Sequence, residues 1–125
     1  MVDKMPFNQL LGIRVARLHK DGVTIQCALR EELRNSAGVL HGGVTATMAD
    51  AAVGISLARH FRGARIATTV ELKISYLRPI MEGTATARAH LVKIGSRLCV
   101  GRVDLFDGER KLAASALVTY MLLES

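Results

Sequence analysis

Two features of the chain, seven residues apart, have residue types suited to acyl-transfer chemistry. The tripeptide His41-Gly42-Gly43 stands just before a long apolar segment, and Asp50 is the only charged residue in segment 42–58. Successive glycines leave their backbone N–H groups unobstructed, and the first N–H groups of a helix have no intrahelical partner. A helix start of this kind can stabilise a developing oxyanion or hold a phosphate group.

Asp50 is a candidate general base or nucleophile. An ionised carboxylate is costly in an apolar interior unless it is hydrogen-bonded, paired with a cation or facing a cavity. A local ion pair does not account for Asp50, because the residues three and four positions on are Val53 and Gly54. We therefore expect its carboxylate to meet a group from another part of the fold, inside a cleft. The alternative is that Asp50 lies on a solvent-facing stripe of its helix.

One long helix should carry both features. It is predicted over Gly43–His60, because eight of the seventeen residues 42–58 are Ala or Gly. A helix that is apolar nearly all round is a buried helix, and small side chains let a sheet approach it closely. At about 1.5 Å per residue, Gly43 and Asp50 lie roughly 10 Å apart along this helix. Both could serve one reacting carbon only if two helices ran antiparallel across a two-fold axis, so we expect a homodimer with two composite sites.

The rest of the chain has the patterns of strands and turns. Alternation and β-branched residues predict six strands. They are Ile13–His19, Val23–Leu29, Ile66–Leu77, Gly83–Ile94, Arg97–Phe106 and Leu112–Leu122. The short turns between them leave no room for crossover helices, so the strands should be antiparallel. With a helical turn at Met5–Gly12 and a loop at Glu31–Gly38, we predict an α+β fold: a hairpin, a central helix, and an antiparallel meander curving round the helix.

Length and composition fit one packed domain over residues 1–125. Half of the residues are hydrophobic and 22% are charged, which excludes a disordered chain. No apolar stretch approaches the ~18 residues of a membrane-spanning helix, and the first residues lack the apolar core of a signal peptide. Cys27 and Cys99 have no metal-like spacing, and the four histidines are not grouped as metal ligands. We therefore expect a cytoplasmic protein with two reduced thiols and no metal.

The net charge of +6 is unevenly distributed. Residues 1–58 carry six Lys/Arg against five Asp/Glu, and residues 59–125 carry eleven against six. This excess favours an anionic partner, which could be nucleic acid, an acidic membrane surface or a phosphorylated small molecule; the alternative is a solvated basic surface. Nucleic acid is disfavoured, because the long helix is apolar and aromatic residues for base stacking are scarce.

The segment around the helix start also has a specific spacing. It is Asn35-Ser-Ala-Gly38-Val-Leu-His41-Gly42-Gly43, with Asp50 nine residues after the histidine. It closely resembles the hotdog-fold acyl-CoA thioesterases, in the phenylacetate-degradation branch that includes the thioesterase superfamily member 2 proteins. The resemblance continues through Thr68–Pro79 and Lys93–Arg97 to the end of the chain. It implies a hotdog fold, a curved antiparallel sheet wrapped round one central helix, in a homodimer or a dimer of dimers.

The resemblance also implies the reaction and its residues. The reaction is hydrolysis of an acyl-CoA thioester with no metal or other cofactor, since CoA is part of the substrate. Asp50 would be the catalytic carboxylate, acting as base on water or as nucleophile, and the Gly43 N–H would be the oxyanion donor. His41 and Asn35 would orient the thioester and water. Thr69, or Thr68 in the other possible register, would position water opposite Asp50.

Binding of CoA would give the basic second half of the chain a cause. The candidate contacts to substrate and to the CoA phosphates are Gly42, Arg62, Arg65, Tyr76, Arg78, Lys93, Gly95, Ser96 and Arg97. The signatures of hotdog dehydratases and of the 4-hydroxybenzoyl-CoA branch are missing, which disfavours those activities. A non-catalytic acyl-CoA-binding module is the alternative function, because the same groove can bind without turnover. The sequence does not specify the acyl group.

Overall fold

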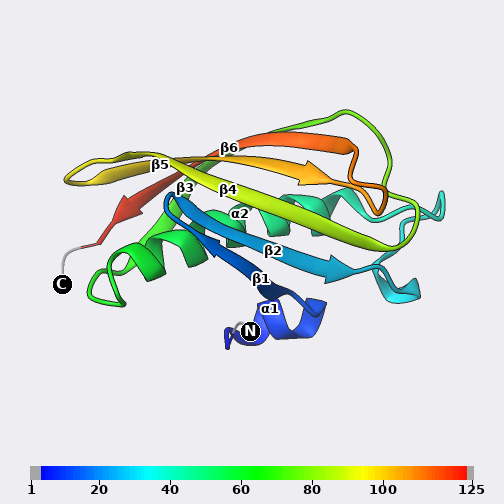
Figure 1. The fold of residues 1–125 in the computed structure, drawn as a ribbon, viewed down its shortest axis with the longest axis horizontal. Helices are drawn as coiled ribbons and strands as arrows, with labels where there is room; N and C mark the ends of the chain where they lie inside the picture. The colour runs from blue at the N-terminus through cyan, green and yellow to red at the C-terminus, as the bar shows by residue number, and fades with distance from the viewer. Residues whose placement is uncertain (1–3, 124–125) are drawn as a thin grey trace.

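The computed structural model describes residues 4–123 as one curved sheet with a long helix against one face (Figure 1). The helices are α1 (Pro6–Leu11), the short 3-10 helix η1 (Glu31–Leu33) and α2 (Gly42–His60). The strands are β1 (Arg14–His19), β2 (Gly22–Ala28), β3 (Ala67–Tyr76), β4 (Thr84–Ile94), β5 (Leu98–Phe106) and β6 (Leu112–Leu122). All pairings are antiparallel, in the order β1-β2-β4-β5-β6-β3. The predicted α+β architecture is confirmed.

Small residues on the sheet bring α2 close to it. Ala85, Ala87 and Ala89 of β4 alternate toward the helix and are all buried. At Gly101 of β5, an added Cβ would lie 2.6 Å from Cγ2 of Val53 in α2. A side chain larger than hydrogen therefore cannot be placed at this crossing without moving the helix.

The strand order differs in one respect from the predicted meander. Only β4, β5 and β6 form a meander, whereas β3 lies at the far edge and pairs with β6. The physical reason is that β2 already pairs with the outer side of β4, so β3 takes the open edge of β6. The loop expected at Glu31–Gly38 also contains η1, and Arg34 beyond it forms a bridge to Leu40.

The helix is less enclosed than its composition predicts. One face, which includes Met48, Ala52 and Val53, is fully buried. The opposite face, which includes Thr47, Asp50 and Gly54, is only half-buried within this chain. The neighbouring edge strand β3 is exposed along most of its length, with Val70 at 51% and Leu72 at 37%. An apolar helix face beside an unpaired strand edge is unusual for an isolated chain.

Two further predictions concern the cysteines and membrane-spanning helices, within the described residues. Cys27 and Cys99 are free, buried thiols. Among residues 4–123, no helix is long and apolar enough to cross a bilayer.

Candidate active site

The carboxylate of Asp50 is held by two hydroxyl groups from the sheet. Thr69 Oγ1 of β3 donates to Asp50 Oδ1 at 2.7 Å, and Tyr120 Oη of β6 lies 2.8 Å from the same oxygen. Tyr120 Oη also lies 2.9 Å from the Asp50 carbonyl oxygen. The group expected from elsewhere in the fold is therefore a pair of hydroxyls. Thr69, and not Thr68, makes this contact.

Both hydroxyls come from one position of the sheet. Thr69 and Tyr120 are paired directly across the β3–β6 ladder, just before a register shift between Thr69 and Glu71. Directly opposed residues in a ladder lie on the same face, here the face toward α2. The two donors therefore reach the carboxylate together.

The start of α2 is capped by the histidine that precedes it. His41 is the N-cap, and its Nδ1 accepts a hydrogen bond from the Gly43 N–H at 2.8 Å. The Gly43 donor that the sequence predicts to be open is thus occupied by the His41 ring. Within residues 4–123, no acceptor is placed on the Gly42 N–H. The first helical residue therefore presents the available donor.

Tyr76 fixes this helix start to the end of β3. Its hydroxyl donates to the Gly42 carbonyl oxygen at 2.6 Å, and burial raises the pKa of the Tyr76 phenol above its ordinary value. The phenol therefore stays a donor through the neutral pH range. Tyr76 thus contacts the backbone of the helix start, and its predicted contact with substrate stays a prediction.

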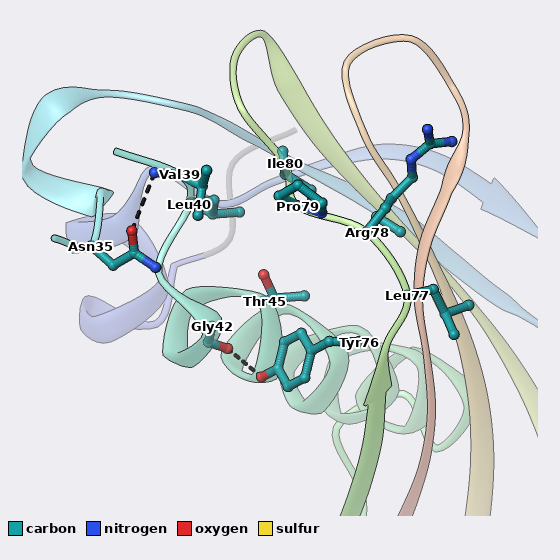
Figure 2. A pocket seen from close by; sticks show the side chains of 11 residues that line it. Asn35, Val39, Leu40, Gly42, Thr45, Tyr76, Leu77, Arg78, Pro79 and Ile80 are labelled. Carbon is teal, nitrogen blue, oxygen red and sulfur yellow. Dashed lines mark hydrogen bonds between the residues drawn. The ribbon is translucent and has the colours of Figure 1, made fainter. Parts of the chain in front are cut away.

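A cavity of about 350 Å³ opens beside the helix start (Figure 2). Asn35, Gly42, Tyr76 and Arg78 line it. The Asn35 Oδ1 accepts from the Ala37 and Val39 N–H groups, which closes the loop before the helix. Figure 2 shows the Asn35 amide nitrogen directed away from Val39, on the side of the helix start. Four predicted site residues thus share one cavity.

A second cavity, of about 380 Å³, lies further along α2. Thr69 and Tyr120 line it together with Gly54, Leu57 and Phe61. Its wall is mainly apolar, apart from Thr68, Arg65 and the two hydroxyl residues next to Asp50. The guanidinium of Arg65 lies 5.9 Å from the centre of the Phe61 ring. An apolar group attached to an atom near Asp50 would fit into this space.

The predicted basic contacts do not form one cluster. Arg78 is near the start of α2, where its Nε lies 3.8 Å from Asp107 Oδ2. Arg62, beyond the other end of α2, lines a separate cavity of about 340 Å³ together with Lys20 and Arg59. Lys93 near the end of β4 and Gly95, Ser96 and Arg97 of the β4–β5 turn line none of these three cavities. Figure 1 places this turn at the end of the sheet opposite the β3–β4 connection that holds Arg78.

Among the described residues, no group of three or more His, Cys, Asp or Glu side chains has an arrangement that could hold a metal ion. The groups that meet at Asp50 are one carboxylate and two hydroxyls, and the backbone donors of the helix start lie roughly 10 Å away along the same helix. Tyr120 is the one member of this set that sequence reasoning missed. The only local indication of its role in the sequence is a side chain with a polar hydroxyl at a strand position whose side chain points toward the core.

Comparisons with known proteins show which family the chain belongs to. The family model described as the thioesterase superfamily matches residues 37–114, which include the helix start, Asp50 and Thr69. The chain is 35% identical to the medium/long-chain acyl-CoA thioesterase YigI of Escherichia coli, over 94% of this chain and 86% of that protein. It is 27% identical to the 1,4-dihydroxy-2-naphthoyl-CoA hydrolase of Listeria monocytogenes, over 86% of this chain and 88% of that protein.

A likeness in three dimensions accompanies these sequence matches. A solved thioesterase of Haemophilus influenzae superposes with a TM-score of 0.89 at 23% identity, over 94% of this chain and 82% of that chain. The hotdog fold is therefore confirmed, while the phenylacetate-degradation branch stays a prediction. The chain belongs to the thioesterase superfamily.

Proposed function

We propose that this protein hydrolyses acyl-CoA thioesters to the free acid and CoA. The observation that carries the proposal is the Asp50 carboxylate, fixed by Thr69 and Tyr120 on the same helix whose start offers backbone donors. A carboxylate for water or the acyl carbon, together with helix-start donors for the oxyanion, is the minimum set for thioester cleavage. The similarity to an acyl-CoA thioesterase supports the CoA part of the substrate.

Each active site would be shared between two copies of the chain. Seven residues of helix separate Gly43 from Asp50, or roughly 10 Å at 1.5 Å per residue, so one chain cannot apply both to one carbon. The half-buried face of α2 and the exposed edge of β3 are the surfaces that a second copy would cover. The donors of one protomer would then meet Asp50 of its partner. A dimer of dimers is the further assembly that we propose.

The steps of the reaction follow from these positions. As a base, Asp50 would take a proton from water while the water oxygen bonds to the acyl carbon; as a nucleophile, its own oxygen would form that bond. In either case the carbonyl oxygen becomes an oxyanion and the carbon–sulfur bond then breaks. The CoA thiolate takes the proton held by Asp50 if Asp50 is a base. If Asp50 is a nucleophile, the thiolate takes a proton from solvent, and water then hydrolyses the anhydride to the free acid. The Gly42 N–H is the open donor for the oxyanion, and the Gly43 N–H joins it if the His41 ring turns away.

Other residues would bind and orient the substrate. The Asn35 amide and His41 stand beside the helix start, where they can orient the thioester and water. The apolar cavity beside Tyr120 is the space that we assign to the acyl group. The basic residues at the two ends of the sheet, Arg78 on one side and Lys93 and Arg97 on the other, would contact the CoA phosphates of the two composite sites.

The proposal includes no metal and no cofactor apart from the CoA of the substrate. Its support is the donor set at Asp50, which consists of two hydroxyls and contains no imidazole, thiol or second carboxylate. We also propose a cytoplasmic location, which two buried free thiols support.

A panel of aliphatic and aromatic acyl-CoAs, with release of free thiol as the readout, tests the proposed function. The wild-type protein should release CoA catalytically from at least one member of the panel, and Asp50→Asn should lower kcat by orders of magnitude while the fold is retained. Stoichiometric binding of acyl-CoA with no release of CoA would instead indicate the binding module. Unchanged turnover in Asp50→Asn would remove that residue from the mechanism.

A further inference from the structure

Tyr120 approaches Asp50 from a distant strand and is held there closely. The residue is 8% exposed, and its hydroxyl lies within 2.9 Å of both the carbonyl oxygen and the Oδ1 of Asp50. Burial raises the pKa of the Tyr120 phenol above its ordinary value of 10.0. The phenol therefore remains protonated, and able to donate, at any pH at which the protein would work.

The helix contains a gap shaped for this hydroxyl. Gly54 lies one turn after Asp50, and a Cβ built at Gly54 would be 2.6 Å from Tyr120 Oη and 3.3 Å from Tyr120 Cζ. Contacts under 3.0 Å are essentially never made by real Cβ atoms. The hydroxyl can therefore occupy its place only because position 54 has no side chain.

The two oxygens of the Asp50 carboxylate are unequal as a result. Oδ1 lies within hydrogen-bond distance of two hydroxyls, those of Thr69 and Tyr120. Within residues 4–123, the structure places no donor on Oδ2. A carboxylate held by one oxygen cannot swing freely, so its second oxygen has a defined direction.

We propose that Tyr120 is a positioning residue, which together with Thr69 holds Oδ1 of Asp50 and so reserves Oδ2 for the water molecule or the acyl carbon. This inference rests on the proposed function. If Asp50 is a base, the proton of water moves to Oδ2. If it is a nucleophile, the new carbon–oxygen bond forms at Oδ2 and water later cleaves the resulting anhydride.

The test compares Tyr120→Phe with the wild-type protein under the same thiol-release assay. Loss of one hydrogen bond to a charged group should lower kcat by about 10- to 100-fold, with little change in KM. Thr119→Val is the matched control. It removes a hydroxyl from the residue before Tyr120 in β6, on the other face of the sheet, and should leave kcat and KM unchanged.

A second variant makes the test independent of the phenol itself. Gly54→Ala should displace the hydroxyl and reduce kcat about as much as Tyr120→Phe does. In the double variant the missing hydroxyl relieves the contact, so the second substitution should cost little more. Additive losses in the double variant would contradict the shared mechanism. A kcat of Tyr120→Phe equal to that of the wild type would overturn the inference.

These outcomes separate the inference from the proposed function. If Asp50→Asn abolishes turnover while Tyr120→Phe has no effect, thioester hydrolysis through Asp50 stands and the positioning role fails. If the wild-type protein cleaves no acyl-CoA, the proposed function fails, and the positioning role fails with it. The thermal unfolding midpoint of each variant is also measured, and a midpoint equal to that of the wild type shows that the fold is retained.

Discussion

The available donor at the start of α2 can be removed without adding or removing a side-chain charge, by the substitution Gly42→Pro. Proline has no N–H and is well tolerated at the first position of a helix, which Gly42 occupies directly after the N-cap. The preceding residue must be extended when proline follows, and His41 already is, with φ −59° and ψ 132°. The substitution therefore deletes one backbone donor while the helix can still begin in the same place.

The size of the effect follows from the role that we assign to this donor. Removal of one oxyanion donor costs about 3 kcal/mol of transition-state stabilisation, which is roughly 100-fold in kcat. Gly42→Ala is the control, because it adds the same Cβ but keeps the N–H. That Cβ would lie 3.3 Å from the Tyr76 hydroxyl, so a small steric cost is common to both variants. The difference between the two variants reports the donor alone.

The same variant tests whether the active site is shared between two chains. The Gly42→Pro and Asp50→Asn variants should each be inactive when expressed alone. The two variants are then co-expressed and purified as a mixture of dimers. In a mixed dimer one of the two composite sites has both groups intact, so random pairing should restore about one quarter of wild-type activity. No recovery in verified mixed dimers would refute the shared site. Equal activity of the proline and alanine variants would refute the role of the Gly42 N–H.

Two further predictions concern stability. Gly101→Ala should lower the free energy of unfolding by about 1–3 kcal/mol in urea denaturation, because its Cβ would lie 2.6 Å from Cγ2 of Val53. Val53→Ala should then cost less stability in the Gly101→Ala background than in the wild type, and strictly additive losses would contradict this contact. Hydrogen bonds from His90 and His19 lower the pKa of Asp21 from 3.8 to about 2. Since the folded pKa is lowered, the stabilisation from Asp21 is complete above about pH 4 and is lost as the pH falls toward 2, so urea midpoints measured across this range should decline more steeply in the wild type than in Asp21→Asn. Equal pH dependence of the urea midpoints in the two proteins would show that the hydrogen bonds of Asp21 with His19 and His90 contribute nothing to stability in acid.

The sequence allows good prediction of the elements and of one half of the site. The long helix, the six strands and the meeting of Asp50 with a group from another part of the fold all follow from local patterns, because burial, propensity and turn chemistry act within a few residues. The resemblance to hotdog thioesterases implies a hydroxyl residue opposite Asp50, which is Thr69 in one register and Thr68 in the other. The structure shows Thr69 in direct contact with the carboxylate.

The rest of the site depends on information that local patterns do not contain. Tyr120 reaches Asp50 because β3 pairs with β6, and strand order is a property of the whole sheet. The cap on Gly43 was equally hard to foresee, since histidine is not among the side chains that usually cap helix starts. The predicted full burial of α2 is wrong within one chain, because composition alone does not tell which side of a helix a second chain would cover.

The narrow fit between Gly54 and the Tyr120 hydroxyl restricts how this pair can change over time. A tyrosine introduced opposite an alanine at position 54 would meet a contact near 2.6 Å, whereas a phenylalanine there would meet only the ring carbon at 3.3 Å. We therefore expect substitutions at positions 54 and 120 to be epistatic, because the hydroxyl fits its place only where position 54 is glycine.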